Sequence, residues 1–393
     1  MSSSDPVVIV GISRTPMGGL LGDLADLTAS QLGATAIEGA LKDAGVSAAD
    51  VSEVIMGNCL PAGQGQAPAR QATLGADLPL STHSVTINKM CGSGMQAAMM
   101  GQNALKAGAA KIVVAGGMES MTNAPHVTFV RKGHKYGAMQ TYDHMAKDGL
   151  EDAYENQPMG IYADMVAGEY QFTREQQDAY ALETLTRAQN ATKEGKFKRE
   201  IAPVTIKTRK GEVTIDTDEL PRSARPEKIP TLRPAFTKDG TVTAANASAI
   251  SDGAAALVLM LQSEAEARGL KPLAKIVSMA NHSQEPKYFT TAPVPAMKKA
   301  LELAGWGVDD VDLWEINEAF AVVPMIAMKE LGMTADKVNV NGGACAMGHP
   351  IGASGARIVV TLINAMEQQD AKKGVASLCI GGGEGIAMTI ERF

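Results

Sequence analysis

The residues Ala40-Leu41-Lys42-Asp43-Ala44-Gly45 recur in the second half of the chain as Ala300-Leu301-Glu302-Leu303-Ala304-Gly305. At the same offset, Asp50-Val51 recurs as Asp310-Val311. In both copies, apolar residues at helical spacing lead up to a glycine, which is typical of an amphipathic helix that ends there. The repeat therefore predicts that the chain is built from two similar halves.

Each copy continues with the same order of elements. A strand-like run follows the helix, Val54-Ile55-Met56 in the first copy and Leu313-Trp314-Glu315-Ile316 in the second. Further on, Cys91-Gly92-Ser93-Gly94 and Gly352-Ala353-Ser354-Gly355 each precede a helix-like stretch. Alternating strands and helices in both copies predict an α/β fold. A chance match between short Ala/Gly-rich strings is the alternative, and the constant offset and shared order argue against it.

Residues 122–248, between the two copies, differ in character. Thr173 and Gln176 have the spacing of a capping box, which predicts the start of a long polar helix. The runs at 204–206 and 212–215 predict a β-hairpin. We therefore expect an inserted loop domain, and insertions of this kind often supply binding surface.

The length of the chain also indicates several folding units. At 393 residues it is longer than a single hydrophobic core usually supports. Hydrophobic residues make up 45% and charged residues 20%, as in an ordinary globular enzyme. The expected parts are an N-terminal half at residues 1–121, completed by about residues 249–271, a loop domain at 122–248, and a C-terminal half at 272–393.

Charge and hydropathy exclude several classes of protein. The net charge of −7 argues against a general nucleic-acid binder, because that role needs a basic surface. No apolar run approaches the length of a membrane span, and the N-terminus lacks the apolar core of a signal peptide. We therefore expect a cytoplasmic protein whose partners include neither nucleic acid nor a membrane.

The cysteines offer candidates for chemistry. No Cys-x-x-Cys pair is present, so neither a disulfide framework nor a zinc site is expected. Taken singly, each cysteine is equally well explained as a small buried apolar residue. The four cysteines are Cys59, Cys91, Cys345 and Cys379.

Cys91 has the most suggestive local sequence. It stands between a β-like run, Val85-Thr86-Ile87, and the small residues Gly92-Ser93-Gly94 that open a helix. The positive end of the helix dipole is expected to lower the pKa of this thiol below the usual value of roughly 8.5. A thiolate with small neighbours would be a competent acceptor of an acyl group.

Further motifs contain groups suited to acid–base chemistry. His349 lies in a glycine-rich loop and can exchange a proton near neutral pH. Cys379 ends a β-rich run before Gly381-Gly382-Gly383, whose N–H groups can bind an oxyanion. The amide of Asn317 can hold a water or a donor in place. Each of these residues, taken alone, has an equally simple structural explanation.

Together, these motifs resemble the thiolase family in their order and at its spacing. The resemblance extends over essentially the whole chain, and a set of five motifs in order is highly specific. The motifs are Asn88-Lys89-Met90-Cys91-Gly92-Ser93-Gly94, Gly116-Gly117-Met118-Glu119-Ser120-Met121, Asn317-Glu318-Ala319-Phe320, Gly348-His349-Pro350-Ile351-Gly352 and Cys379-Ile380-Gly381-Gly382-Gly383.

The resemblance implies a layered αβαβα fold of two pseudo-twofold-related βα halves, with an inserted loop domain over the active site. It implies reversible, coenzyme A-dependent cleavage of 3-ketoacyl-CoA to acetyl-CoA and a shortened acyl-CoA. The same activity includes condensation of two acetyl-CoA to acetoacetyl-CoA, by a ping-pong mechanism through an acyl-Cys91 intermediate. Coenzyme A is then a substrate, and neither a cofactor nor a metal is required. The expected partners are coenzyme A thioesters and further copies of the chain in a homotetramer.

The resemblance also implies roles for individual residues. Cys91 is the nucleophile, His349 resembles the base that activates it, and Cys379 resembles the acid/base that exchanges a proton with the α-carbon of acetyl-CoA. One oxyanion site is expected from His349 with a water held by Asn317. The other is expected from the backbone N–H groups of Cys91 and Gly381.

Substrate contacts follow in the same way. Ser248 resembles a pantetheine contact, and Arg222 is a candidate for the nucleotide phosphates. Pro158 stands where acetoacetyl-CoA-specialised members typically have a histidine, so strict selectivity for four-carbon chains is not expected. Cys345 and Glu384 also depart from the family pattern. The pantetheine and acyl channel would be lined by Leu150, Met159, Phe236, Ala244, Ala319 and Phe320.

Two other functions are consistent with the same fold. A ketosynthase would resemble this chain, but that branch has histidine or asparagine in the third catalytic position, where this chain has Cys379. A non-catalytic acyl-CoA- or lipid-binding relative would not need Cys91, His349 and Cys379 together. The preferred chain length, the physiological direction, and the choice between dimer and tetramer stay open at this stage.

Overall fold

The computed structural model describes residues 5–209 and 211–393. The N-terminal half contains a sheet of order β4-β3-β5-β10-β1. Strand β3 pairs in parallel with β4 and β5, whereas β10 is antiparallel to both β5 and β1. The strands are β1 (Val7–Arg14), β3 (Glu53–Gly57), β4 (His83–Ile87), β5 (Ile112–Ser120) and β10 (Ser251–Leu261).

The C-terminal half repeats this pairing pattern. Strand β12 is parallel to β13, and β14 is antiparallel to both β13 and β11. Trp314 of β12 also forms a parallel β-bridge with Val338. Val338 thus lies beside β12 as β4 lies beside β3 in the N-terminal half. The strands are β11 (Ala274–Ser283), β12 (Leu313–Ile316), β13 (Lys373–Ile380) and β14 (Glu384–Glu391).

The two sheets are continuous through one short contact. Strands β1 and β11 pair antiparallel at Val8–Lys275 and Ile9–Ala274. The predicted duplication is confirmed at its helices as well. Helices α1 (Ala29–Ala44) and α8 (Pro293–Ala304) both end at a glycine with positive φ, 65° at Gly45 and 69° at Gly305. Glycine adopts that conformation at little steric cost, which explains why the repeat ends in glycine in both copies.

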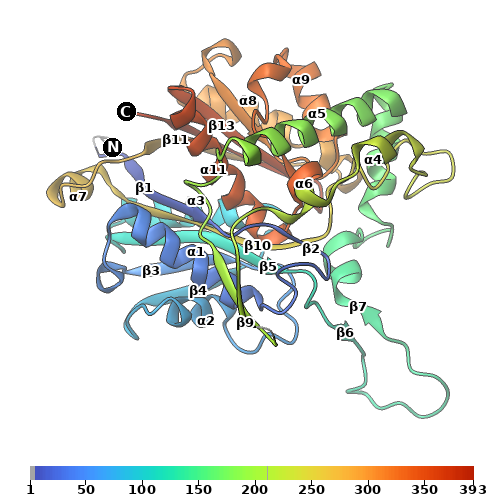
Figure 1. Ribbon diagram of the computed structural model, residues 1–393, viewed down its shortest axis with the longest axis horizontal. Helices are drawn as coiled ribbons and strands as arrows, with labels where there is room; N and C mark the ends of the chain where they lie inside the picture. Colours follow the sequence, from blue (N-terminus) through green and yellow to red (C-terminus); the bar gives the residue numbers. More distant parts are fainter. Residues whose placement is uncertain (1–4, 210) are drawn as a thin grey trace.

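Helices form three layers around the sheets, as Figure 1 shows. Helices α1 and α2 cover the outer face of the N-terminal sheet, and α8 and α9 cover the outer face of the C-terminal sheet. Helices α3 and α11 lie between the sheets, in the central buried cluster to which both sheets contribute. The predicted αβαβα layering is thereby confirmed. The helices are α1 (Ala29–Ala44), α2 (Pro68–Gly75), α3 (Ser93–Lys106), α8 (Pro293–Ala304), α9 (Val322–Leu331) and α11 (Ile351–Gln368).

The two central helices approach one another closely at glycines. A Cβ atom on Gly94 would lie 2.6 Å from the backbone nitrogen of Ala356, and one on Gly355 would lie 2.5 Å from that of Met95. No side chain fits at either place. The close approach brings the N-termini of α3 and α11 together, so the loops that precede them, with Cys91 and His349, meet at the centre of the molecule.

The inserted segment packs on both halves: α4 and α5 contact the C-terminal half, and β8–β9 packs against the buried cluster of the N-terminal half. Its predicted long helix is α5, with the capping box of Thr173 and Gln176 present, and its predicted hairpin is β8–β9. A hairpin arm, β6–β7, extends away from the body in Figure 1. The elements are β6 (His126–Val127), β7 (Tyr142–Asp143), η2 (Ala146–Leu150), α4 (Met159–Glu169), α5 (Arg174–Lys193), β8 (Val204–Thr208), β9 (Gly211–Ile215), α6 (Glu219–Ser223) and η3 (Pro226–Thr231).

Short elements complete the chain. No helix within the described residues has the combination of length and apolar character needed to cross a bilayer. These elements are β2 (Gly18–Gly19), η1 (Ala48–Asp50), α7 (Gln262–Ala267), η4 (Pro286–Thr291), η5 (Val308–Asp310), η6 (Ala335–Lys337) and α10 (Ala344–Met347).

Candidate active site

Cys91 lies in the short loop between β4 and α3, directly before the helix. It is half-buried, and its thiol faces the backbone N–H groups of Gly381 and of Cys91 itself. Burial raises the pKa of the Cys91 thiol to about 11, and these two N–H groups offset only part of that rise. The prediction that this pKa is lowered is therefore wrong, because burial outweighs the helix terminus.

Cys379 is the second sulfur at this place. It is the penultimate residue of β13, and the glycine run that follows presents Gly381 to Cys91. Its side chain is buried, and burial together with the neighbouring Cys91 raises the pKa of the Cys379 thiol well above its usual value. A Cys91 thiolate would oppose the ionisation of Cys379, so the two sulfur atoms lie near one another. Both are neutral before substrate binds.

His349 precedes α11 and is buried. Its Nδ1 atom lies 2.6 Å from the hydroxyl of Ser354, in the first turn of that helix, whereas Nε2 has no hydrogen-bond partner among the described residues. Burial, and then the charge of Arg357, lower the pKa of His349 to about 3. The imidazole is therefore neutral, and its free nitrogen is available to a ligand.

The Ser354 hydroxyl suits both neutral forms of this imidazole. It also lies 3.0 Å from the carbonyl oxygen of Pro350. When the hydroxyl donates to Pro350, it can accept from a protonated Nδ1, which leaves Nε2 as a base. When the hydroxyl turns and donates to Nδ1, Nε2 carries the proton and can donate to an oxyanion.

Glu119 joins the loops that carry these groups. Its buried carboxylate accepts hydrogen bonds from the Asn58 side chain at 2.7 Å and from three backbone N–H groups, those of Cys59 at 2.8 Å, Leu60 at 3.1 Å and Gly352 at 2.9 Å. Burial raises the pKa of Glu119 to about 7. Glu119 belongs to one of the five sequence motifs, but no local pattern pointed to this role.

Asn317 follows β12 and is fully buried. Its Nδ2 atom lies 3.5 Å from Nδ1 of His349, so its side chain faces the nitrogen opposite to the unpartnered Nε2. The next residue, Glu318, holds the loop before His349 in place, since its carboxylate accepts from Thr184, Tyr180, Asn339 and the backbone of Cys345.

Most of the predicted acyl-channel residues gather near these groups. Leu150 packs in the same apolar cluster as Cys91. Met159 approaches Gly381, since its terminal carbon would lie 4.0 Å from a Cβ there. The rings of Phe236 and Phe320 meet edge to face, with centroids 6.0 Å apart.

The remaining predicted contacts lie beside that ring pair. The backbone N–H of Ser248 donates to the carbonyl of Ala319 at 2.9 Å, and the neighbouring Ala247 bridges Phe320. These contacts place Ser248, the expected pantetheine contact, next to two of the residues that were expected to line the acyl channel.

A groove of about 250 Å³ lies along the inserted segment. Ala244 lines it, together with Arg225 and Lys228, which were not predicted from the sequence. Arg222 does not line this groove, and its guanidinium pairs with Asp23 instead. The full lining is Ala181, Leu185, Leu220, Ser223, Ala224, Arg225, Lys228, Ile229, Leu232, Ala244, Ala245, Ala249, Cys345 and Ala346.

The three departures from the family pattern have distinct surroundings. Pro158 is exposed and precedes the first turn of α4. Cys345 lines the groove, and its backbone N–H donates to Glu318 at 3.0 Å. Glu384 forms an ion pair with Lys89, two residues before Cys91.

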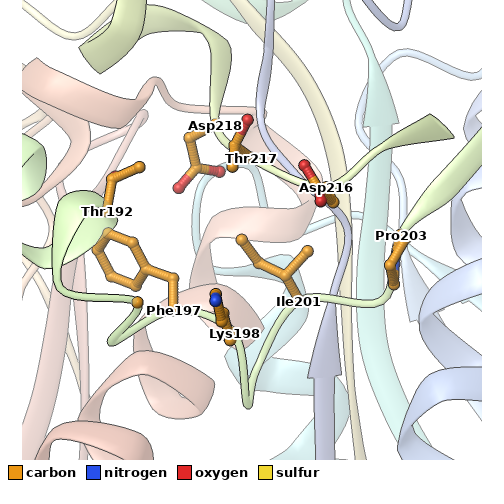
Figure 2. A pocket seen from close by; sticks show the side chains of 9 residues that line it. Thr192, Phe197, Lys198, Ile201, Pro203, Asp216, Thr217 and Asp218 are labelled. Carbon is orange, nitrogen blue, oxygen red and sulfur yellow. The ribbon is translucent and has the colours of Figure 1, made fainter. Parts of the chain in front are cut away.

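A second cavity, of about 190 Å³, contains none of the predicted site residues. Figure 2 shows Phe197, Ile201 and Asp218 around it. The carboxylate of Asp218 is already engaged, because the guanidinium of Arg14 donates to it at 2.7 and 2.9 Å. This cavity is therefore separate from the chemistry around Cys91.

Comparison with known proteins agrees with this geometry. Residues 7–263 match the family model described as "Thiolase, N-terminal domain", and residues 270–392 match "Thiolase, C-terminal domain". An acetyl-CoA acetyltransferase of Rhizobium meliloti (strain 1021) is 50% identical over 392 residues, with 100% of both chains covered. A cytosolic acetyl-CoA acetyltransferase of Mus musculus is 48% identical over 394 residues, covering 100% of this chain and 99% of that one.

A solved structure has the same fold. The crystal structure of the Acat5 thiolase of Ascaris suum in complex with coenzyme A superimposes with a TM-score of 0.94 at 45% identity. The match covers 99% of this chain and 100% of the other. Full-length similarity in sequence and in fold leads to one conclusion: the chain belongs to the thiolase family.

Proposed function

We propose that this chain is an acetyl-CoA C-acetyltransferase that also accepts 3-ketoacyl-CoA substrates with somewhat longer acyl chains. The observation that carries the proposal is the position of the Cys91 thiol, which faces the Gly381 N–H with the Cys379 thiol beside it. A nucleophile, an oxyanion donor and a second acid/base then meet at one place. The names of relatives at about half sequence identity support the same activity.

In the cleavage direction, the reaction begins at the 3-keto carbonyl. Nε2 of His349 takes the Cys91 proton while the sulfur attacks, since neither group is charged beforehand. The C2–C3 bond breaks, leaving an acyl-Cys91 thioester and an acetyl-CoA enolate. Cys379 gives its proton to the enolate carbon and becomes the thiolate.

Coenzyme A completes the cycle. Its thiol gives a proton to the Cys379 thiolate and attacks the acyl-Cys91 thioester. The Cys91 sulfur leaves and recovers its proton from His349, so all three groups return to their starting states. Condensation of two acetyl-CoA is the same sequence in reverse, which is a ping-pong mechanism.

The backbone N–H groups of Cys91 and Gly381 are proposed to bind the oxyanion that forms at the 3-keto carbonyl when the Cys91 sulfur attacks it. The imidazole of His349, which carries a proton on Nε2 once it has taken the Cys91 proton, is proposed to bind the enolate oxygen of the acetyl-CoA half. A water held by Asn317 would complete the latter site only if the amide reached the Nε2 side. The amide faces Nδ1.

The groove beside α6 is proposed to hold coenzyme A. Arg225 and Lys228 are placed to meet its phosphates, and Ala244 and Leu232 to contact its pantetheine and adenosine parts. Leu150, Met159, Phe236, Ser248, Ala319 and Phe320 remain the proposed acyl and pantetheine contacts. Since Arg222 is tied to Asp23, its proposed phosphate contact would require that pair to open.

A homotetramer in the cytoplasm is proposed for the assembled enzyme. The β6–β7 arm exposes large apolar side chains, with Phe129 81% and Tyr136 97% exposed. Such surfaces are unfavourable in water, and a second copy of the chain would cover them. Sedimentation velocity of the wild type and of a Phe129→Ser/Tyr136→Ser variant tests this, because the variant should sediment as a smaller species.

Activity assays test the proposed reaction directly. Purified enzyme should cleave acetoacetyl-CoA with coenzyme A, and Cys91→Ser should lower kcat by at least about 10³-fold, since an alcohol is a far weaker nucleophile. Wild-type rates in Cys91→Ser would overturn the assignment of the nucleophile. Substrates from four to ten carbons measure the chain-length range, and activity on four carbons alone would show that Pro158 does not loosen selectivity.

A further inference from the structure

A buried arginine lies behind the candidate site. Arg357 is on α11, one turn beyond Ser354, and is 2% exposed. Its Nη2 atom donates to Oδ1 of Asn317 at 3.5 Å, and its Nη1 atom lies 3.5 Å from the carboxylate of Glu315. Because α11 presents residues three apart on one face, it turns Ser354 towards the imidazole of His349 and Arg357 towards the amide beside it.

The chemistry of the guanidinium fixes the orientation of that amide. A guanidinium contains donors only, so the group of Asn317 that faces it must be the carbonyl oxygen. The NH₂ group then faces His349, where it lies 3.5 Å from Nδ1. Without the arginine, the two ends of the amide would be interchangeable by a half-turn of the side chain.

From this geometry we propose that Arg357 is a positioning residue for the thiolase reaction, which orients the amide of Asn317 and through it the imidazole of His349. The proposal rests on the proposed function, because it concerns the same site. Arg357 touches no substrate, and it acts through the residue in front of it.

The charge of Arg357 also favours the neutral form of His349. Burial is the main cause that lowers the pKa of His349 to about 3, and the positive charge of Arg357 is the second, so the imidazole stays neutral between turnovers. The contacts of Nδ1 with Asn317 and Ser354 hold the ring in one orientation, with Nε2, which has no hydrogen-bond partner among the described residues, on its other side. In that orientation Nε2 can take the Cys91 proton and then donate it to an oxyanion.

Glu315 explains why a charged guanidinium is tolerated here. It lies on β12 and is 1% exposed, and within the described part of the chain its carboxylate oxygens have no hydrogen-bond partner. Burial raises the pKa of Glu315 to about 8, and the charge of Arg357 offsets part of that rise. Removing Arg357 alone would leave this carboxyl group buried without the charge that faces it, which usually destabilises a protein. A useful variant must therefore replace both side chains together.

The test uses the full-length enzyme and the double substitution Arg357→Met/Glu315→Gln. Replacing a buried ion pair by neutral groups of similar size is often tolerated, so the variant is expected to fold. Acetoacetyl-CoA cleavage should show a kcat lowered by about 10- to 100-fold with little change in KM, less than the loss of a whole oxyanion donor. Thermal unfolding and circular dichroism serve as the folding control.

A coupling measurement separates positioning from a general loss of structure. If Arg357 acts through Asn317, adding the double substitution to Asn317→Ala should lower kcat no further than Asn317→Ala alone. The proposal would be overturned if the double substitution lowered kcat as much in the Asn317→Ala background as it does in the wild type. A wild-type kcat in the folded double variant would also overturn it. Failure of the wild type to cleave acetoacetyl-CoA would instead overturn the proposed function.

Arg357→Lys keeps the test decisive if the double variant does not fold. Lysine retains the charge beside Glu315 but lacks the planar fork that holds the amide at the same time. We expect near wild-type thermal stability with a kcat lowered at least about 10-fold. A lysine variant with wild-type kcat would show that the charge alone suffices and that the amide needs no orientation.

Discussion

The carboxylate of Glu119 accepts a hydrogen bond from the backbone N–H of Gly352 at 2.9 Å, across 233 positions of sequence. Glu119 belongs to β5 of the N-terminal half, and Gly352 lies in the first turn of α11 in the C-terminal half. The same carboxylate holds Cys59 and Leu60, whose loop packs against Cys91. One buried side chain thus sets the distance between the nucleophile loop and the histidine loop.

Glu119→Gln should weaken both the fold and the activity. Glutamine has one acceptor oxygen, and its NH₂ group would face backbone donors that now meet a carboxylate. We expect the free energy of unfolding to fall by about 3 kcal/mol, because hydrogen bonds to charged groups are lost and donors stay buried. Urea unfolding measures this. Glu384→Gln, at a partly exposed ion pair, is the control and should change stability by under about 1 kcal/mol.

Alkylation of Cys91 should report its raised pKa. Only the thiolate reacts with iodoacetamide, and below a pKa of about 11 the thiolate fraction grows tenfold for each unit that the pH rises. The rate in the unliganded enzyme should therefore keep rising between pH 7 and pH 10. Mass spectrometry identifies the labelled site, with Cys91→Ala as the control. A plateau near pH 8 would show that the thiol is activated before substrate binds.

In the groove proposed to hold coenzyme A, Arg225 and Lys228 should matter for binding, whereas the nearby Arg222 should not. Arg225→Ala/Lys228→Ala removes the charges that line it and should raise KM for coenzyme A by about 10-fold or more, with a weaker effect on kcat, since remote phosphate contacts contribute mainly uniform binding. Arg222→Ala is the matched control outside the groove and should leave KM within about twofold. The opposite ranking would place the nucleotide at Arg222.

Close packing of the central helices should make Gly355 irreplaceable. In Gly355→Ala the new Cβ would lie 2.5 Å from the backbone of Met95, which can relieve the overlap only if α3 and α11 separate. We expect a loss of about 2 kcal/mol or more in unfolding free energy, and lower kcat because Cys91 and His349 precede these helices. Gly168→Ala, in α4 with open space around it, should instead stabilise by about 0.5 kcal/mol.

The repeat and the local patterns were by themselves enough to predict two similar α/β halves, and the resemblance to the thiolase family supplied the layered αβαβα arrangement. The two helices that end at Gly45 and Gly305 depend only on backbone conformation and neighbouring residues, so the sequence predicts these helices well. The capping box at Thr173 and the hairpin beyond it were predicted for the same reason. The motifs around Cys91 indicated the family.

Tertiary structure decided the pKa values of the buried groups and which residues contact one another across the chain. The pKa of Cys91 was predicted in the wrong direction, because the cost of burying a thiolate depends on how deeply folding encloses it. Glu119, Arg357 and the groove cations Arg225 and Lys228 had no local signal, since each acts through residues distant in sequence. A sequence specifies short-range geometry directly, whereas burial and long-range contact arise only when the two halves close on one another.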